Sequence, residues 1–420
     1  MYKKAFYLVV CLFSFLIQDF AYAQTIVVDG EIRTRGEYRS GFQSPLADTL
    51  HSAAVQLLRT RLNIAYSSDK IKAKMILQDS RVYGQTGINN TNNSLGLYEA
   101  WGAYLFSPEF SATLGRQSLE YDDKRIFSAA NWSNTGNAHD LLLLKYESAA
   151  GIKAHFGSAW NNGGDVLHES SYTVSRSYKI MNYIWLANRF GKFDVSALWL
   201  NDGFQRGTTN DLVNKLSYRN TVGANLSLKE KAIPYSFYAS AYYQFGHNPI
   251  NKSLRGYLLS LENQYTITNK WSVTLGADYL SGSKSNSASD KDRTFSKLYG
   301  ANHSFNGSIE YWATLPAQGL FDLYGGITFK PNSKFNIDAT FHKFSLAQEL
   351  SSTDNKNIGS ELDITANYTI NPEITIQGGW SAYFITNQTK IVKNLAGIDT
   401  KFPNWAYVMI SFKPTFLYKK

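Results

Sequence analysis

The chain has 420 residues, and its 42 Lys and Arg against 33 Asp and Glu give a formal net charge of +9 at pH 7. A mean hydropathy of −0.29 and the lack of any uninterrupted apolar stretch of about 20 residues exclude a helical membrane protein. The basic residues are dispersed rather than clustered, which argues against nucleic acid as a partner.

The first residues have the three parts of a secretory signal peptide. Lys3 and Lys4 precede the apolar run Ala5–Ile17, and Ala21-Tyr22-Ala23 forms a cleavage site after it. A positive start, a short apolar run and small residues at the cleavage site are typical of an export signal. We therefore expect residues 1–23 to be a signal peptide and residues 24–420 to form a single domain.

The first element of the exported part alternates strictly between charged and uncharged residues. The charged positions are Asp29, Glu31, Arg33, Arg35, Glu37 and Arg39. The residues between them are Val28, Gly30, Ile32, Thr34, Gly36 and Tyr38. A period of two places the two sets on opposite faces of one β-strand. One ionic face and one uncharged face favour a transmembrane barrel with a charged lumen, the alternative being an exposed edge strand of a soluble sheet.

Strand patterns recur along the rest of the chain. We predict them at Gln56–Tyr66, Ile71–Arg81, Tyr98–Phe106, Ser111–Gln117, Asp140–Glu147, Ile152–Trp160, Lys179–Asn188, Lys192–Leu200, Leu216–Leu228, Tyr235–Phe245, Arg255–Tyr265, Trp271–Leu280, Leu320–Lys330, Phe335–Phe344, Ile358–Ile370, Glu373–Phe384 and Trp405–Phe412. In Trp271–Leu280, the apolar stripe has Trp271 at one end and Tyr279 near the other, as at the two interfaces of a membrane. We predict an all-β, transmembrane antiparallel β-barrel of about 18 strands, of the outer-membrane type.

The connections between these strands are expected to alternate in length. Asn188–Lys192 and Ile370–Glu373 are tight turns that contain Gly, Pro or Asn, as periplasmic turns should be. Asn161–Ser177, Ser281–Asn306 and Ser345–Asn357 are long and polar, as extracellular loops should be. This alternation places the protein in the outer membrane of a Gram-negative cell.

Several sequence blocks resemble the alginate-export family of outer-membrane porins. They are Gln78–Arg81, Leu114–Gln117, Tyr121–Arg125, Trp132 and Gly136–Asp140. Leu298–Phe305 with Gly307, and Gly359–Asp363, are similar to blocks of the Bacteroidetes-type members. The resemblance covers most of the exported chain. It implies an 18-stranded barrel with a narrow, electropositive conduit, which in the best-studied members passes an acidic exopolysaccharide.

A polyuronate carries one carboxylate per sugar, and guanidinium groups can bind such carboxylates through two hydrogen bonds. The candidate lumen residues are Arg33, Arg35, Arg59, Arg61, Lys72, Lys74, Arg81 and Arg116, together with Glu31 and Glu37. Rings of Arg and Lys are typical of anion pores, and neighbouring carboxylates keep the arginines in position. The alternative is that these residues form cross-strand ion pairs that only stiffen the wall. Asp79 and Arg81 share a face with Ile71, so either they lie above the membrane or a bulge shifts the register.

A second group of candidates follows the strand that ends at Gln117. Asp122, Asp123, Lys124 and Arg125 are predicted to fold inward as a constriction, the alternative being an ordinary polar turn. We expect no catalysis, cofactor or metal, because the histidines are scattered and no Gly-rich phosphate loop is present. Asn161–Asp165 could offer oxygens to Ca²⁺, but a flexible surface loop is the favoured interpretation. Cys11, the only cysteine, lies in the signal, which excludes a disulfide framework and a cysteine nucleophile.

The predicted function is therefore an outer-membrane channel that passes anionic saccharides, such as an alginate-like polyuronate, or other small anions. Expected partners are outer-membrane lipid and lipopolysaccharide, the permeant itself, and periplasmic export or uptake components. One alternative is a plugged barrel that acts as a surface adhesion or assembly platform through its long extracellular loops. Another is a soluble exported carbohydrate-binding protein.

Overall fold

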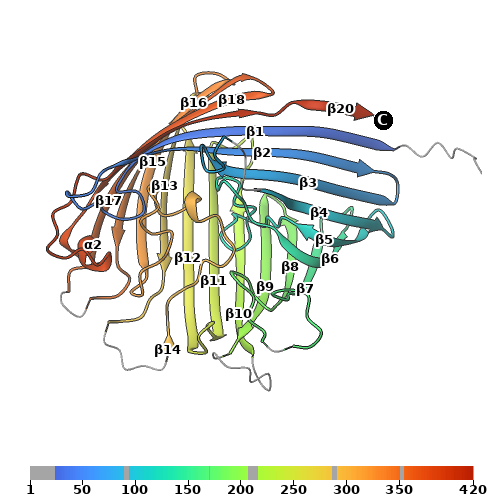
Figure 1. Cartoon of the computed structure of the whole chain (residues 1–420), viewed down its shortest axis with the longest axis horizontal. Coiled ribbons are helices and arrows are strands. Elements are labelled where there is room, and N and C mark those ends of the chain that lie inside the picture. The colour runs from blue at the N-terminus through green and yellow to red at the C-terminus, as the bar shows by residue number, and fades with distance from the viewer. Residues whose placement is uncertain are drawn as a thin grey trace, which may run out of the picture.

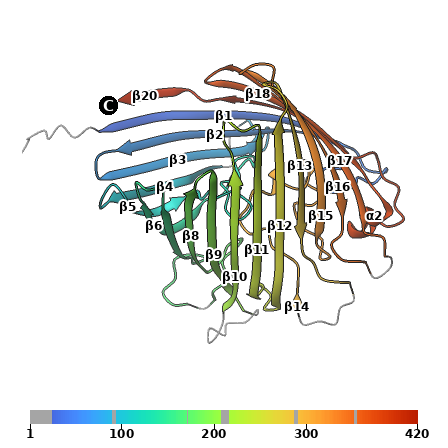
Figure 2. The same ribbon diagram turned by 180° about the vertical axis from the view of Figure 1, so that it is seen from behind.

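The computed structural model describes residues 24–88, 94–169, 171–206, 216–285, 291–350 and 354–419. The signal peptide predicted for residues 1–23 lies outside this part of the chain. The described chain forms one closed, antiparallel β-barrel whose wall has 18 strands. In Figure 1 the colour runs around the wall from blue to red until the first and last strands lie side by side, and Figure 2 shows the same wall from behind.

The wall strands are long, and each pairs with the next along the chain. They are β1 (Thr25–Ser40), β2 (Ala53–Ser67), β3 (Ile71–Val82), β4 (Leu95–Leu105), β5 (Phe110–Gln117), β6 (His139–Glu147), β7 (Lys153–Trp160), β8 (Ile180–Phe190), β9 (Phe193–Gln205), β10 (Leu216–Leu228), β11 (Tyr235–His247), β12 (Ser253–Thr266), β13 (Trp271–Leu280), β15 (Leu320–Phe329), β16 (Phe335–Ser345), β17 (Asn357–Asn371), β18 (Ile374–Phe384) and β19 (Asn404–Phe412).

The barrel closes where β1 meets β19. These strands pair from Ile32 opposite Phe412 to Ser40 opposite Asn404. A short strand, β20 (Thr415–Lys419), follows β19 and pairs with the first residues of β1 after a register shift at Val28. Because β1 also pairs with β2 along its whole length, the wall has no free edge.

All the strands predicted from the sequence are present, which confirms the predicted all-β, outer-membrane-type barrel. Their ends differ by a few residues: β9 runs to Gln205, and β4 begins at Leu95. The sequence patterns did not predict β20 or the short β14 (Lys291–Asp292), which pairs in parallel with β12. They also missed two short helical segments, η1 (Asn302–Ser304) and α2 (Asn387–Val392). Neither helical segment of the described chain has the length or apolar character needed to cross a membrane.

The two rims of the barrel differ, as the alternation of connections predicted. Tight turns join β8 to β9 at Phe190–Phe193 and β17 to β18 at Asn371–Ile374, at what we call the short-turn rim. The described parts of the long connections, including residues 161–179 and 346–356, lie at the opposite, long-loop rim. Two further long connections turn back into the barrel. We call residues 118–138 the first inner segment and residues 293–319 the second inner segment.

The outward face of the wall is suited to lipid. Leu114, Leu275 and Val408 point outward and are 67%, 61% and 56% exposed. Trp271 packs against Phe329 near the short-turn rim, with ring centroids 4.3 Å apart. Apolar side chains flanked by aromatic rings are typical of a strand wall in a bilayer.

Candidate functional site

The two inner segments meet inside the barrel. Phe127 and Tyr299 form a parallel bridge, in which the Ser128 N–H donates to the Tyr299 carbonyl at 3.0 Å. Farther along each segment, the Trp132 ring stacks on the His303 ring, with centroids 4.1 Å apart and planes at 4°. The segments therefore form one structure that crosses the lumen.

The arginines of β1 and β2 hold the first inner segment. Arg33 donates to the Ser133 carbonyl at 2.8 Å, and Arg35 donates to the Trp132 carbonyl at 2.8 Å. Arg59 donates to the carbonyls of Asn131 and Ser133 at 3.0 and 3.1 Å. Such charge-assisted bonds are stronger than bonds between neutral groups. The side chains of Arg33, Arg35 and Arg59 point inward and are buried.

Two carboxylates orient these arginines. Glu31 accepts from Arg59 Nε at 2.8 Å. Glu37 accepts from Arg35 Nε at 2.7 Å and from Arg39 Nε at 2.8 Å. The Arg39 side chain stays 31% exposed, so it keeps donors that can face the lumen.

Arg61 lies on the same inward face of β2. Its Nη1 donates to Asn131 Oδ1 at 3.1 Å, and its guanidinium lies 3.8 Å from the centre of the Tyr98 ring. The other terminal nitrogen, Nη2, is buried and has no hydrogen-bond partner among the described residues. Arg61 therefore has an unused donor beside the first inner segment.

The predicted constriction residues lie inside the barrel and tie the first inner segment to the opposite wall. Asp122 accepts from Trp185 of β8 at 3.1 Å, and burial raises its pKa above the ordinary value. Asp123 accepts from Ser240 of β11 at 2.9 Å. These contacts fix the start of the segment against the β8–β11 wall.

The next two residues differ in their surroundings. Arg125 is buried and makes two 2.8 Å bonds to Asp278 of β13, plus one of 2.8 Å to Asp123. Lys124 instead remains 49% exposed and pairs with Glu120 at 3.1 Å. Arg125 is thus a structural ion-pair residue, whereas Lys124 presents its charge to open space.

The second inner segment is anchored to β17 by backbone N–H groups, and a lysine contact ties it together internally. The Ile309 N–H donates to Glu361 Oε1 at 2.7 Å, and the Ser308 N–H donates to Asp363 Oδ2 at 3.1 Å. Lys297 Nζ donates to the Trp312 carbonyl at 2.7 Å. Burial, together with the charge of Arg125, lowers the pKa of Lys297 to about 7.

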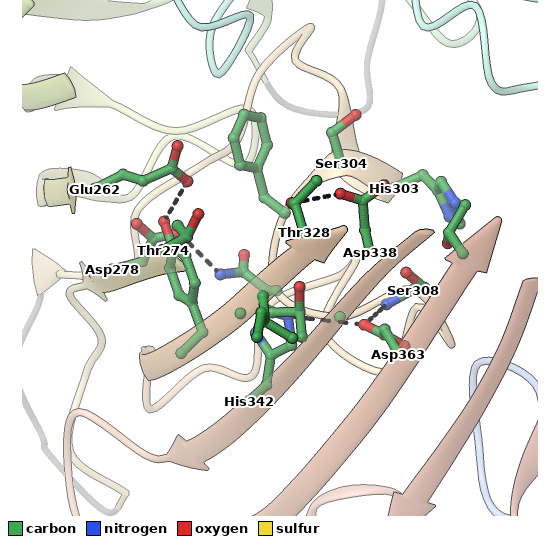
Figure 3. A pocket seen from close by; sticks show the side chains of 18 of the residues that line it. Glu262, Thr274, Asp278, His303, Ser304, Ser308, Thr328, Asp338, His342 and Asp363 are labelled. Atoms are coloured by element: carbon green, nitrogen blue, oxygen red, sulfur yellow. Dashed lines mark hydrogen bonds and ion pairs between the residues drawn. The ribbon is translucent and has the colours of Figure 1, made fainter. Parts of the chain in front are cut away.

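Four cavities border the inner segments, and one of them, about 440 Å³, is lined by Asp122, Trp185 and Tyr238 among others. The other three contain most of the charged residues. The outer chamber, about 520 Å³, lies toward the long-loop rim and is lined by Arg35, Arg39, Glu120, Lys124 and Glu310 among others. The arginine chamber, about 460 Å³, lies toward the short-turn rim and is lined by Glu31, Arg33, Arg59, Arg61 and Lys413 among others. The acidic chamber, about 370 Å³, is lined by Glu262, Asp278, Asp338 and Asp363 among others (Figure 3).

The rest of the lumen is less polar than a charged, water-filled pore would suggest. Ile126 and Phe127 of the first inner segment pack against inward residues of β6–β9, which include Leu143, Tyr183 and Leu200. All five side chains are buried. A hydrophobic core therefore fills part of the lumen between the cavities.

Two of the predicted lumen cations do not face the lumen. Arg81 lies opposite the outward Leu58 and pairs with Asp79 near the long-loop rim. Arg116 lies opposite Asp140 on the outward face and pairs with it at 2.7 Å. The β3–β4 ladder does contain a register shift, between Ile76 and Leu77, but it does not turn Arg81 inward.

The two lysines of β3 lie on the inward face. Lys74 pairs with the buried Glu99 at 3.1 Å. Lys72 follows the same alternation nearer the short-turn rim and is exposed. Neither lysine contributes to the cluster that holds the first inner segment.

Sequence reasoning missed the acceptors of the arginine cluster, because backbone carbonyls leave no trace in residue identity. It also missed the second inner segment and the acidic chamber. A signal for the chamber was present: Glu361, Asp363 and Thr365 alternate along one face of β17, as the charges of β1 do. Asp278 and Asp338 likewise stand on the polar face of strands whose other face is apolar.

Comparison with known proteins places this geometry among outer-membrane barrels. A family model described as alginate export matches residues 25–389. OccK9 (OpdG) of Pseudomonas aeruginosa is 12% identical, with a TM-score of 0.63 over 93% of this chain and 98% of that one. A BenF-like porin of Pseudomonas fluorescens Pf-5 is 9% identical, with a TM-score of 0.63 over 93% and 99%. OccK2 (OpdF) of Pseudomonas aeruginosa, in complex with glucuronate, is 10% identical, with a TM-score of 0.60 over 93% and 98%. No curated protein matches the sequence.

Proposed function

The chain belongs to the alginate export family of non-catalytic outer-membrane channels, and on that premise we propose that its permeant is an anionic saccharide of the polyuronate kind, or another small anion. The path that we propose follows the arginines of β1 and β2. Lys72 and Lys74 extend it toward the short-turn rim. We also assign the chain to the Bacteroidetes-type members, on the two sequence blocks at Leu298–Phe305 and Gly359–Asp363.

One observation carries this proposal: arginines line the cavities on both sides of the constriction. Arg35 and Arg39 line the outer chamber, whereas Arg33, Arg59 and Arg61 line the arginine chamber. Both chambers include Asn131, at the tip of the first inner segment. An anion that passes this point therefore leaves one set of guanidinium groups as it reaches the next.

The cations divide into two roles in this proposal. Arg33, Arg35 and Arg59 spend their donors on backbone carbonyls, so they shape the constriction and set its positive potential. Arg39 and Lys124 are partly exposed and are the groups that contact the permeant. Conduction requires binding that is weak and repeated, and the nearby carboxylates of Glu31 and Glu37 keep any single site from becoming a trap.

The choice of permeant class draws support from a structural relative. OccK2 (OpdF), which shares the fold, was solved with glucuronate bound, and glucuronate is a single uronate unit. The proposed partners of this chain are correspondingly the anionic saccharide, outer-membrane lipid and lipopolysaccharide, and periplasmic export or uptake components.

The test is electrical. Protein purified without its signal and reconstituted in planar bilayers should show a reversal potential of the anion-selective sign in a KCl gradient. Arg39→Gln combined with Arg61→Gln should move that potential toward zero, because both charges face the chambers. Arg116→Gln, which removes one positive charge from the outward face, should leave the potential unchanged. A cation preference of the unmodified channel would overturn the arginine path.

The alternative function, a plugged surface platform, has its own structural support. Phe127, Ile309 and Trp312 of the inner segments are buried inside the barrel, so much of the lumen is closed. If the reconstituted protein passes no current while its long loops bind a ligand, the platform is the better description.

A further inference from the structure

The closed wall of the barrel ends at Phe412, but the chain continues as an edge strand at the short-turn rim. β18 pairs with β19 only as far as Ile374 opposite Phe412, and the last bond on that side runs from the Lys413 N–H to the Glu373 carbonyl at 2.8 Å. β20 (Thr415–Lys419) continues past the β17–β18 turn and, among the described strands, pairs only with β1. Figures 1 and 2 show it beside the first residues of β1, with no strand on its other side.

β20 is held in an extended conformation by β1 alone. The Gly30 N–H donates to the Pro414 carbonyl at 3.0 Å, and β20 then pairs with Ile26–Val28. The ring of Phe416 packs over Gly30, so closely that a Cβ atom at Gly30 would come within 2.8 Å of it. A partner that binds β20 therefore meets a strand that is already ordered, and less conformational entropy is lost on binding.

The edge of β20 that faces away from β1 is exposed and uncharged. All residues of Thr415–Lys419 are exposed, and Phe416, Leu417 and Tyr418 are 63%, 46% and 60% exposed. In an antiparallel strand, every second residue directs its N–H and C=O toward the same edge, so the edge away from β1 carries unpaired backbone groups. Native edge strands are commonly protected by charged side chains, but no charge lies between Thr415 and Tyr418. This edge is therefore open to pairing with another strand.

Two lysines bracket the edge. Lys413 precedes β20 and Lys419 ends it, and residues 413–419 contain no Asp or Glu. Lys413 also lines the arginine chamber, so the edge begins beside that chamber. An extended segment with carboxylates near its ends would meet a lysine at each end of β20, and it would lie next to the anion path.

We propose that the free edge of β20 is the docking site for an extended segment of a periplasmic protein, which adds to β1 and β20 as a further strand. In strand addition, main-chain hydrogen bonds supply affinity and alternate side chains supply specificity. The exposed Leu417 and Tyr418 would pack against apolar side chains of the added strand. This inference rests on the proposed function only in taking a periplasmic component as the partner, and it does not involve the arginines of β1 and β2.

The test uses the folded protein in detergent, purified without its signal, and a fluorescein-labelled peptide with the sequence of residues 25–31 as the probe. This segment already pairs with β20 through its other edge, and it carries Asp29 and Glu31. Fluorescence anisotropy should show saturable binding of the peptide. Leu417→Asn combined with Tyr418→Asn should weaken the binding by about tenfold, because apolar contacts are lost and Asn is unfavourable in strands.

A matched control makes the same change elsewhere on the short-turn rim. Tyr265 and Ile267, at the end of β12, are 50% and 55% exposed, and Tyr265 is paired on both sides, with Tyr235 and Val273. Tyr265→Asn combined with Ile267→Asn should leave the binding unchanged. Each variant should first show the same heat-dependent shift in gel mobility as the unmodified barrel, which establishes that it is folded.

Hydrogen exchange gives a second readout that locates the bound peptide. The amides of Thr415–Lys419 should exchange more slowly when the peptide is added, because N–H groups of the free edge become bonded. Faster exchange at Ile26–Val28 would show instead that the peptide displaces β1, and would overturn the docking edge. Equal binding by the unmodified protein and the β20 variant, or no binding by either, would also overturn it and leave Leu417 and Tyr418 as contacts with lipid. The reversal potential in bilayers reports separately on the anion path.

Discussion

The indole of Trp132 lies parallel to the imidazole of His303, with their centroids 4.1 Å apart. The first residue belongs to the first inner segment and the second to the other, so this stack joins two pieces of chain that enter the lumen from different places. The Arg35 guanidinium lies 4.3 Å from the centre of the Trp132 ring. On the other side, Glu310 Oε1 accepts from His303 Nδ1 at 2.8 Å. The stack is therefore held from both ends by charged groups.

Replacing Trp132 should loosen the constriction. Trp132→Ala removes the ring that His303 and Arg35 both contact, an aromatic contribution of about 1 kcal/mol beyond the area buried. We expect a larger single-channel conductance with more frequent fluctuations in bilayers. Trp160→Ala, at a distance from the constriction, is the control, and an unchanged conductance in Trp132→Ala would show that the stack does not limit the path.

Removing an arginine that holds the backbone should destabilise the first inner segment. Arg59→Gln takes charge-assisted donors from two carbonyls, at about 1.5–3 kcal/mol for each such bond, and leaves Glu31 without its partner. The heat-dependent gel shift should occur at a lower temperature than in the unmodified protein. Arg59→Lys keeps the charge but loses the planar fork, so it should restore only part of the difference. If the gel shift occurs at the same temperature in the unmodified protein, Arg59→Gln and Arg59→Lys, then Arg59 does not stabilise the first inner segment.

The ion pair between Arg125 and Asp278 gives a prediction with an internal control. Arg125→Met leaves a buried, unpaired carboxylate, which should cost about 3–5 kcal/mol. Adding Asp278→Asn removes that carboxylate and should recover much of the loss. The temperature of the gel shift measures both variants. If the double variant is less stable than Arg125→Met, the cost does not come from the unpaired charge.

Lys393, which follows α2, should make the long-loop rim sensitive to pH. Its Nζ donates to the carbonyl of Gln43 at 3.0 Å and also to that of Tyr311, and burial lowers its pKa to about 8 from 10.5. A released lysine returns toward its ordinary pKa, so the released state binds more protons between pH 8 and 10.5. Release should therefore become rarer as the pH rises through that window.

Current fluctuations in bilayers at pH 7 and pH 10 measure this effect. The unmodified channel should become quieter at the higher pH, with a fall in the frequency of large transitions that approaches a hundredfold, because the interval from pH 7 to pH 10 covers nearly two pKa units of linkage. Lys393→Met should show a much weaker dependence. An equal pH dependence in the two proteins would assign the effect to another group.

The strands could be predicted because their alternation is a local property: Asp29 to Arg39 need only the period of two to define two faces. The inner segments could not, because residues 118–138 have no period and are positioned by contacts with strands far away in the sequence. For Arg81 the period of two already indicated the face of Ile71, and its pairing with the outward Leu58 agrees with that face. Arg116 was included only as a cation, and its pairing with Asp140, next to the outward pair Leu114 and Leu142, places it on the outer face.

The pairing of β1 with β19 has a consequence for how the molecule can be made. The two halves of this seam, β1 and β19, are separated by residues 41–403 of the chain, so the cylinder cannot close until Asn404–Phe412 has been made and exported. Until then, one edge of β1 has unpaired N–H and C=O groups that can pair with a strand of another chain. A chain that stops before Asn404 should stay an open sheet and depend on the cell's assembly apparatus to shield that edge.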